Sequence, residues 1–142
     1  MKAVHPYLLF KGNAAEAFRF YEQVFRSEVT SRTSYEELGM SMSDDDAGML
    51  ANISLPIAPG VSLMASDVSE AMDPGLRIGG NVQITLVPDD ADEAYRVFAA
   101  LSEGGTVRQE LTQTVFAELY GETVDRFGTS WIVIIGDEQA MG

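Results

Sequence analysis

The sequence predicts an α+β fold made of two βαβββ modules. Two observations predict it most directly. The order strand, helix and three strands occurs twice along the 142 residues, and EAFR at residues 16–19 aligns with EAYR at residues 93–96. The last predicted strand, residues 131–135 (WIVII), is aromatic and β-branched throughout, which is typical of a strand covered on both faces. We therefore place it in the middle of a sheet, with earlier parts of the chain closing around it.

The first module begins with a predicted strand at residues 3–10 and a helix at residues 14–25. Apolar residues recur along the helix at spacings of three and four, as one buried face requires. Asn13 precedes the helix and Glu16 follows three residues later, the pattern of a capping box. We therefore expect Asn13 to cap the helix, and three strands to follow it at residues 28–34, 50–55 and 61–66.

Two segments of the first half lack a strand or helix pattern. Residues 35–49 hold three consecutive aspartates and two glycines. They form either a solvated loop with charge repulsion or a mobile flap near a ligand. Residues 69–80 are rich in glycine and contain a Pro-Gly pair. We take them as the linker between a first module at about 1–68 and a second at about 81–142.

The second module repeats the first. A strand is predicted at residues 81–87, and a helix at residues 91–101 opens after two aspartates and closes at two glycines. Three further strands are expected, and they cover residues 106–109, 115–119 and 131–135. The stretch from Tyr120 into the DRFG turn is expected to be a loop that feeds the last of them.

Composition excludes several classes of protein. The formal net charge of −13 argues against nucleic acid, whose phosphates this surface would repel. The same charge suits solubility alone or a cationic ligand. The absence of cysteine excludes disulfides, thiolate catalysis and Cys-ligated metals. No stretch resembles a signal peptide or approaches the length of a membrane span, so we expect a cytoplasmic protein.

The motifs at the two ends of the chain resemble a known superfamily. GNAAEA at residues 12–17, with FY at 20–21 and VF at 24–25, resembles the opening of vicinal-oxygen-chelate proteins (glyoxalase, bleomycin-resistance and dioxygenase proteins). DRFG at residues 125–128, followed by Trp131, is similar to the PhnB-like branch.

The resemblance covers nearly the whole chain and implies one domain, residues 1–142, with two curved mixed sheets and commonly a homodimer. Some members of the branch carry the label 3-demethylubiquinone methyltransferase. No glycine-rich cofactor loop follows a predicted strand in this chain.

The resemblance also bears on a metal. Enzymes of the superfamily hold a divalent ion with His, Glu or Gln from the first and last strands of each half. His5 lies at the first-strand position of this chain and Gln83 at its counterpart, but the last-strand positions near Leu63, Met64 and Ile132 carry no carboxylate. Divalent metals need three or four N or O ligands. We expect no cofactor and no complete metal site, with a divalent metal on His5 and Gln83 as the alternative.

Other residues are candidates for binding or catalysis. Glu118 is either a pocket carboxylate that serves as a base or a polar residue on the solvent face of an alternating strand. Strand alternation and the family resemblance place a mixed aromatic and polar set nearest the ligand cleft, of the kind that small-molecule sites use. These residues are Tyr7, Asn52, Met64, Ser66, Tyr120 and Trp131.

Three functions follow from these patterns. The first is the binding of a small molecule in a cleft without a complete metal site. The second is a metal-dependent lyase, isomerase or dioxygenase of the same superfamily. The third is the sequestration of a cationic drug, as in bleomycin-resistance proteins, with which the charge of −13 is compatible. The missing last-strand carboxylates favour the first and third functions over the second.

Overall fold

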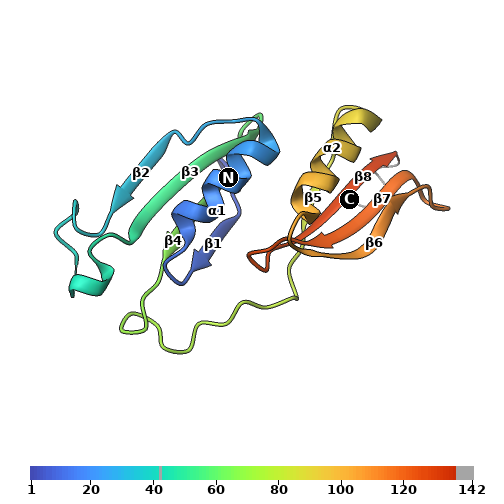
Figure 1. Ribbon diagram of the computed structural model, residues 1–142. Coiled ribbons are helices and arrows are strands. Elements are labelled where there is room, and N and C mark those ends of the chain that lie inside the picture. The colour runs from blue at the N-terminus through green and yellow to red at the C-terminus, as the bar shows by residue number, and fades with distance from the viewer. Residues whose placement is uncertain (42, 137–142) are drawn as a thin grey trace. The chain divides into compact units, whose positions relative to one another are not determined.

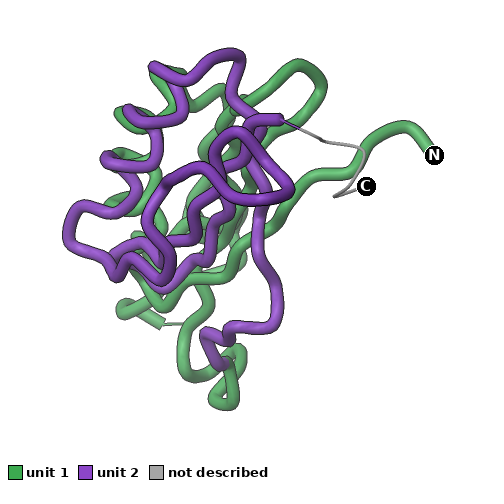
Figure 2. The backbone as a smooth tube through the Cα atoms, turned by 90° about the vertical axis from the view of Figure 1, so that its right-hand side faces the viewer, with its two compact units in different colours: residues 1–76 green, residues 77–142 purple. Residues whose placement is uncertain are grey.

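The computed structural model describes residues 1–41 and 43–136 (Figure 1). The chain divides into two compact units, Met1–Leu76 and Arg77–Gly142, which Figure 2 shows in different colours. The boundary falls inside the predicted linker at 69–80. Each unit contains one α-helix and one four-stranded mixed sheet, in the order strand, helix and three strands. The predicted α+β class and the repeated βαβββ order are therefore confirmed.

The first unit has its strands in the spatial order β1-β4-β3-β2. β1 runs parallel to β4, whereas β4 with β3 and β3 with β2 are antiparallel. Helix α1 packs against β3 and β4 (Figure 1). The bounds are β1 Tyr7–Phe10, α1 Ala14–Phe25, β2 Ser31–Ser34, β3 Leu50–Ala58 and β4 Val61–Asp67, with a short 3-10 helix η1 at Asp44–Asp46.

A buried carboxylate fixes the start of α1. Asn13 makes no side-chain hydrogen bond to the helix, so the predicted capping by Asn13 is wrong. Asp67, at the end of β4 and only 2% exposed, takes its place. One carboxylate oxygen accepts from the N–H groups of Gly12 (3.1 Å) and Ala14 (2.9 Å), and the other accepts from that of Leu50 (2.9 Å). A negative charge is also favourable at a helix N-terminus. Through these hydrogen bonds Asp67 connects the end of β4 to the turn at Gly12, the start of α1 and the start of β3.

The acidic segment of the first unit is partly internal. Asp46 in η1 is 1% exposed, and its carboxylate accepts from the Ser41 hydroxyl and the Ser43 N–H, each at 3.0 Å. Asp44 and Asp45 are exposed. Asp46 is therefore a structural residue, because its carboxylate holds the turn through these two hydrogen bonds, whereas Asp44 and Asp45 are exposed to solvent.

The second unit repeats this arrangement with the strand order β5-β8-β7-β6. β5 runs parallel to β8, and the remaining pairs are antiparallel. Helix α2 packs against β6, β7 and β8 (Figure 1). Asp90 caps it, since its carboxylate accepts from the N–H of Glu93 at 2.8 Å. The bounds are β5 Ile84–Leu86, α2 Ala91–Ser102, β6 Thr106–Thr112, β7 Ala117–Val124 and β8 Ser130–Gly136.

The DRFG turn of the second unit is organised by Asp125, which is 3% exposed. Its Oδ1 accepts from the N–H groups of Phe127 (2.8 Å) and Thr129 (3.1 Å), and its Oδ2 accepts from the indole N–H of Trp131 (2.8 Å). Gly128 has φ 92°, a left-handed conformation that glycine adopts freely. The turn is therefore built around one carboxylate that also anchors the buried tryptophan of β8.

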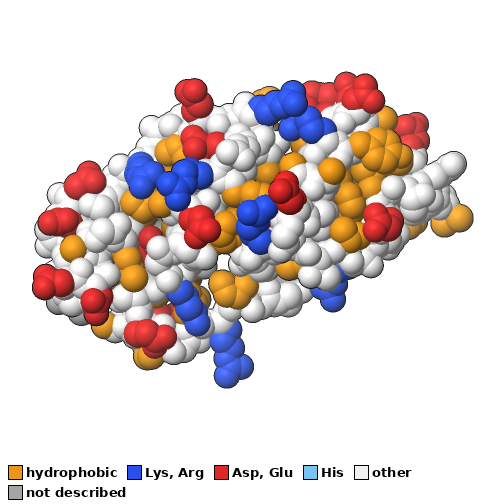
Figure 3. All heavy atoms as spheres, in the orientation of Figure 1, with side chains coloured by type: hydrophobic (Ala, Val, Ile, Leu, Met, Phe, Trp, Pro, Cys, Tyr) orange, Lys and Arg blue, Asp and Glu red, His pale blue; other side chains and the backbone are white. Residues whose placement is uncertain are grey.

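The surface carries charges of both signs. Acidic side chains are spread over the visible face in Figure 3, with Lys and Arg between them. Neither α-helix, in the part of the chain that the structure describes, is long and apolar enough to cross a membrane.

Candidate functional site

Four predicted ligand residues share one sheet face in the first unit. Tyr7 pairs with Met64 across β1 and β4, and the next pair on that face places Ser66 beside Leu9. Asn52 of β3 alternates with the buried Ile53, so its side chain points away from the α1 core. Tyr7 is 48% exposed, Asn52 and Met64 are half-buried, and Ser66 is 8% exposed. The structure therefore brings Tyr7, Asn52, Met64 and Ser66 to the face opposite α1.

Tyr35 belongs to the same region, although it was not among the predicted ligand residues. Its hydroxyl donates to the backbone carbonyl of Asp67 at 2.8 Å. Burial raises the pKa of Tyr35 above its usual 10.0, the nearness of Tyr7 raises it further, and a hydrogen bond with Ser66 opposes the rise. Tyr35 falls in the segment expected to be a loop or flap. No strand or helix period marked it.

The second unit has a comparable face opposite α2. Tyr120 lies directly across from Ile134, and Glu122 across from Ile132, so the four side chains share one side of the sheet. Tyr120 packs with the two isoleucines and Ala117 in one apolar cluster. Phe116 meets the Tyr120 ring edge to face, with 5.0 Å between centroids.

A hydrogen bond between Gln83 and Glu122 lies beside this apolar surface. The Gln83 side-chain amide, just before β5, donates to the Glu122 carboxylate at 2.9 Å. Glu122 makes no ion pair with any residue that the structure describes. Burial raises the pKa of the Tyr120 hydroxyl above 10.0, and the negative charge of Glu122 and hydrogen bonding to it raise it further. The result is an acceptor carboxylate and a neutral phenol beside an apolar surface.

Glu122 lies on β7, so the predicted loop at this residue is wrong. β7 continues through Tyr120 to Val124, beyond its predicted end at residue 119. The alternation of Glu118, Tyr120 and Glu122 with more buried residues was the available signal for a longer strand.

Trp131 and Glu118 are placed apart from this group. Trp131 is 0% exposed and lies across from Thr123, on the face of the sheet opposite to Tyr120. Its indole N–H is held by Asp125, so the structure does not bring it together with Tyr120. Glu118 is exposed, and its side chain makes no hydrogen bond to a described residue. The solvent-facing interpretation of Glu118 matches this position.

The two metal candidates do not form a metal site within either unit. His5 is exposed and precedes β1, and its Nδ1 accepts from the Ser62 N–H at 3.0 Å, so that lone pair is engaged. Gln83 and Glu122 offer oxygen atoms in the second unit, but the family's last-strand position there is the apolar Ile132. Within residues 1–41 and 43–136 no group of three or more His, Cys, Asp or Glu could hold a metal ion. Among the residues that the structure describes, the donors within each unit do not fit the three or four ligands that a divalent metal needs.

Comparison with known proteins identifies the family. A family model described as 3-demethylubiquinone-9 3-methyltransferase matches residues 2–134. The chain belongs to this PhnB-like family. The resemblance found in the GNAAEA and DRFG motifs is thereby confirmed, and those motifs now have a structural explanation. Both lie next to a buried carboxylate, Asp67 at the first motif and Asp125 within the second.

Solved structures extend this result. Protein PA1353 from Pseudomonas aeruginosa is 33% identical to the PhnB-like chain, with a TM-score of 0.77 over 94% of this chain and 97% of that one. A PhnB protein from Bacillus cereus, described as a 3-demethylubiquinone-9 3-methyltransferase, is 22% identical, with a TM-score of 0.78 over 94% of this chain and 98% of that one. A glyoxylase/bleomycin resistance protein/dioxygenase domain from Frankia sp. EAN1pec is 9% identical, with a TM-score of 0.62 over 96% of each chain. The last two show the fold, which is the one the sequence predicted.

Proposed function

We propose that this PhnB-like protein binds a small organic molecule on the sheet face that carries Tyr120 and Glu122, without a complete metal site. The observation that carries the proposal is the Glu122 carboxylate, which accepts from the Gln83 amide at 2.9 Å and has no cationic partner among the described residues. A half-buried carboxylate beside apolar side chains favours a ligand that replaces lost water with hydrogen-bond donors.

The chemistry of the face suggests how a ligand would lie. Its donor group would meet Glu122, whose lone pairs are only partly used by Gln83. Its aromatic or apolar part would lie against the rings of Tyr120 and Phe116, which meet edge to face. Small-molecule sites combine apolar walls with a few fixed polar groups in this way. Tyr7, Asn52, Met64 and Ser66 of the first unit form a second candidate face with the same mixture.

A cationic ligand is the specific form of this proposal that the charges favour. The net charge of −13 raises the local concentration of cations around the chain. Glu122 offers such a ligand an acceptor that no Lys or Arg of the described chain occupies. Sequestration of a cationic drug by a cytoplasmic homodimer therefore remains our second candidate function.

The first experiment separates a binding protein from a metal enzyme. The protein is purified without chelator, its bound metal is measured, and its melting temperature is followed as Ni²⁺, Zn²⁺, Mn²⁺ and Fe²⁺ are added. A ligand that binds only the folded state raises the melting temperature. We expect no stoichiometric metal and no shift. A bound metal whose stabilising effect disappears in His5→Ala would overturn the metal-free proposal and support the lyase, isomerase or dioxygenase.

The second experiment locates the ligand. Aromatic compounds with amine, amide or guanidine donors are screened by ¹H–¹⁵N NMR. For bound compounds we expect amide shifts at residues 116–122, and about a tenfold loss of affinity in Glu122→Gln, since a hydrogen bond to a charged group is removed. Glu118→Gln, an exposed change on the same strand, is the matched control and should leave affinity unchanged. Equal affinity in all three proteins would refute the role of Glu122.

A further inference from the structure

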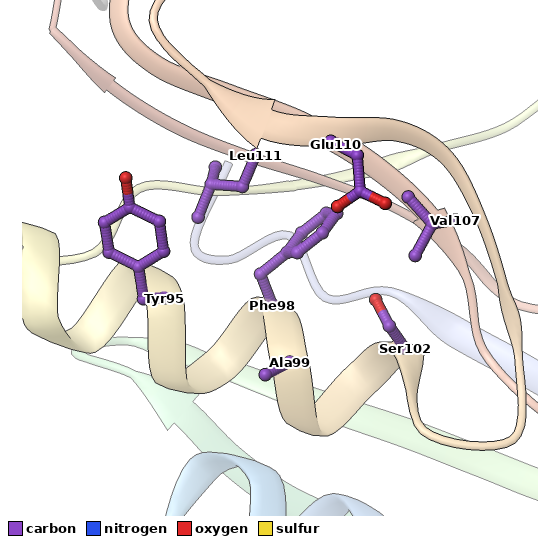
Figure 4. Close-up of a pocket in the computed structure, with 7 residues that line it drawn as sticks. All are labelled: Tyr95, Phe98, Ala99, Ser102, Val107, Glu110 and Leu111. Carbon is purple, nitrogen blue, oxygen red and sulfur yellow. The ribbon is translucent and has the colours of Figure 1, made fainter.

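A cavity of about 270 Å³ lies between α2 and β6, away from the face just described. Figure 4 shows Tyr95, Phe98, Ala99 and Ser102 reaching it from α2, with Val107, Glu110 and Leu111 on the side of β6. Phe98 and Leu111 are 6% and 9% exposed and form part of the core. Tyr95 is 53% exposed, so the cavity has an apolar floor and an aromatic rim that solvent reaches.

The polar atoms at this cavity are mainly acceptors. The Glu110 carboxylate is turned toward α2 in Figure 4 and makes no ion pair with a residue that the structure describes. The Ser102 hydroxyl already donates to the Thr123 hydroxyl at 2.8 Å, and Thr123 in turn donates to the Thr106 carbonyl at 3.3 Å. Ser102 therefore has lone pairs to offer but no proton. Tyr95 adds an aromatic ring with a hydroxyl.

Acceptors beside aromatic rings suit a particular chemistry. An ammonium group has three donors and no acceptor. It is attracted by a carboxylate and by the faces of aromatic rings. A carboxylate ligand would instead be repelled by Glu110. The cavity lies just below the range of about 300–1,000 Å³ that drug-sized ligands fill, which limits the occupant to a small molecule.

We propose that the cavity between α2 and β6 is a second binding site, which takes a small aromatic ammonium compound. Its ring packs on Phe98 and Leu111, and its ammonium group donates to Glu110 and Ser102. This site is independent of the function proposed above, because none of its lining residues lies on the Tyr120 face.

The test uses phenethylammonium as the probe and the full chain labelled with ¹⁵N. At neutral pH we expect amide shifts that saturate at millimolar probe and are centred on residues 95–102 and 107–111. The neutral analogue 2-phenylethanol should bind about tenfold more weakly, and the anion phenylacetate should give no saturable shifts there, since the charge-assisted hydrogen bond is lost or reversed.

Two variants make the test specific. Glu110→Gln should weaken the binding of phenethylammonium about tenfold. Glu118→Gln, which changes another exposed glutamate, on β7, should leave that binding unchanged. Ala99→Leu places a larger side chain in the cavity without altering charge and should abolish the saturable shifts. Unchanged affinity in Glu110→Gln, equal binding of phenylacetate, or shifts centred outside residues 95–111 would each overturn the proposal.

Discussion

Replacement of Asp125 by alanine should destabilise the second unit strongly. The carboxylate is 3% exposed and accepts hydrogen bonds from Phe127, Thr129 and Trp131. The N–H groups of Phe127 and Thr129 belong to half-buried residues and can bind water once the carboxylate is gone. The indole N–H of Trp131 cannot, because the residue is 0% exposed.

The magnitude follows from these differences. A stranded buried donor costs about 1–3 kcal/mol, and hydrogen bonds to a charged group contribute about 1.5–3 kcal/mol each before rehydration. Together with the small cavity left by the carboxylate, we expect a loss of about 3–5 kcal/mol in the free energy of unfolding. Asp125→Asn should lose less, because one oxygen remains, although its amide would face the indole N–H with a second donor.

The measurement has a natural probe. Trp131 is the single tryptophan, so its fluorescence during urea unfolding reports the second unit. Glu118→Gln, an exposed change on β7, is the control and should leave the midpoint within experimental error. A loss below about 1 kcal/mol in Asp125→Ala would show that the three contacts do not stabilise the fold as a buried charged network should.

Three further predictions follow from the structure. The pKa of Tyr120 should lie above 10.0 in the folded chain. Its contribution to stability is therefore complete below the pKa of the unfolded chain and is lost as pH rises through the pKa of the folded chain. Ultraviolet difference spectra of the protein against Tyr120→Phe should show the raised pKa, and Glu122→Gln should move it back toward 10.0. Asp67→Ala should reduce the free energy of unfolding by about 2–4 kcal/mol and speed hydrogen exchange of the α1 amides, because the hydrogen bonds at the start of the helix are lost. Unchanged exchange in α1 would show that the helix does not depend on Asp67. Gly121→Ala should cost about 1–3 kcal/mol by thermal unfolding, because a Cβ there would lie 2.8 Å from an α2 side chain and 2.9 Å from the β6 backbone. Gly80→Ala should cost little, because a Cβ added there would meet no atom within 4 Å apart from its chain neighbours, and equal losses in the two variants would contradict the packing argument.

Much of the fold could be predicted because its helices have clear periods. Both helices begin at the predicted residue, since apolar spacing and flanking Asn, Asp and Gly mark them. The strands were harder to bound. The predicted first strand at 3–10 is reduced to Tyr7–Phe10, and β3 continues through Pro56 to Ala58, beyond its predicted end at residue 55. β2 pairs with β3 only as far as Ser54, so Pro56 lies where that neighbour has ended.

The candidate site was predicted in part for a similar reason. Alternation along β1, β3 and β4 places Tyr7, Met64 and Ser66 together because parity survives small errors in strand ends. Trp131 was grouped with Tyr120, although the two side chains lie on opposite faces of the sheet. The register between β7 and β8 cannot be deduced from the sequence of either strand alone. The helix cap by Asp67 was equally hidden, because it joins residues far apart in the sequence.

The parallel pairing of the first and last strand in each unit has a consequence for how the chain acquires its structure during synthesis. β1 has β4 as its neighbour in the sheet, and β5 has β8. During synthesis β1 and β5 therefore have no neighbouring strand in their sheets until β4 and β8, respectively, have left the ribosome. Contacts between such distant residues slow folding. We expect the first unit to become compact once β4 has emerged, before the second unit has been made, so that the two cores form one after the other.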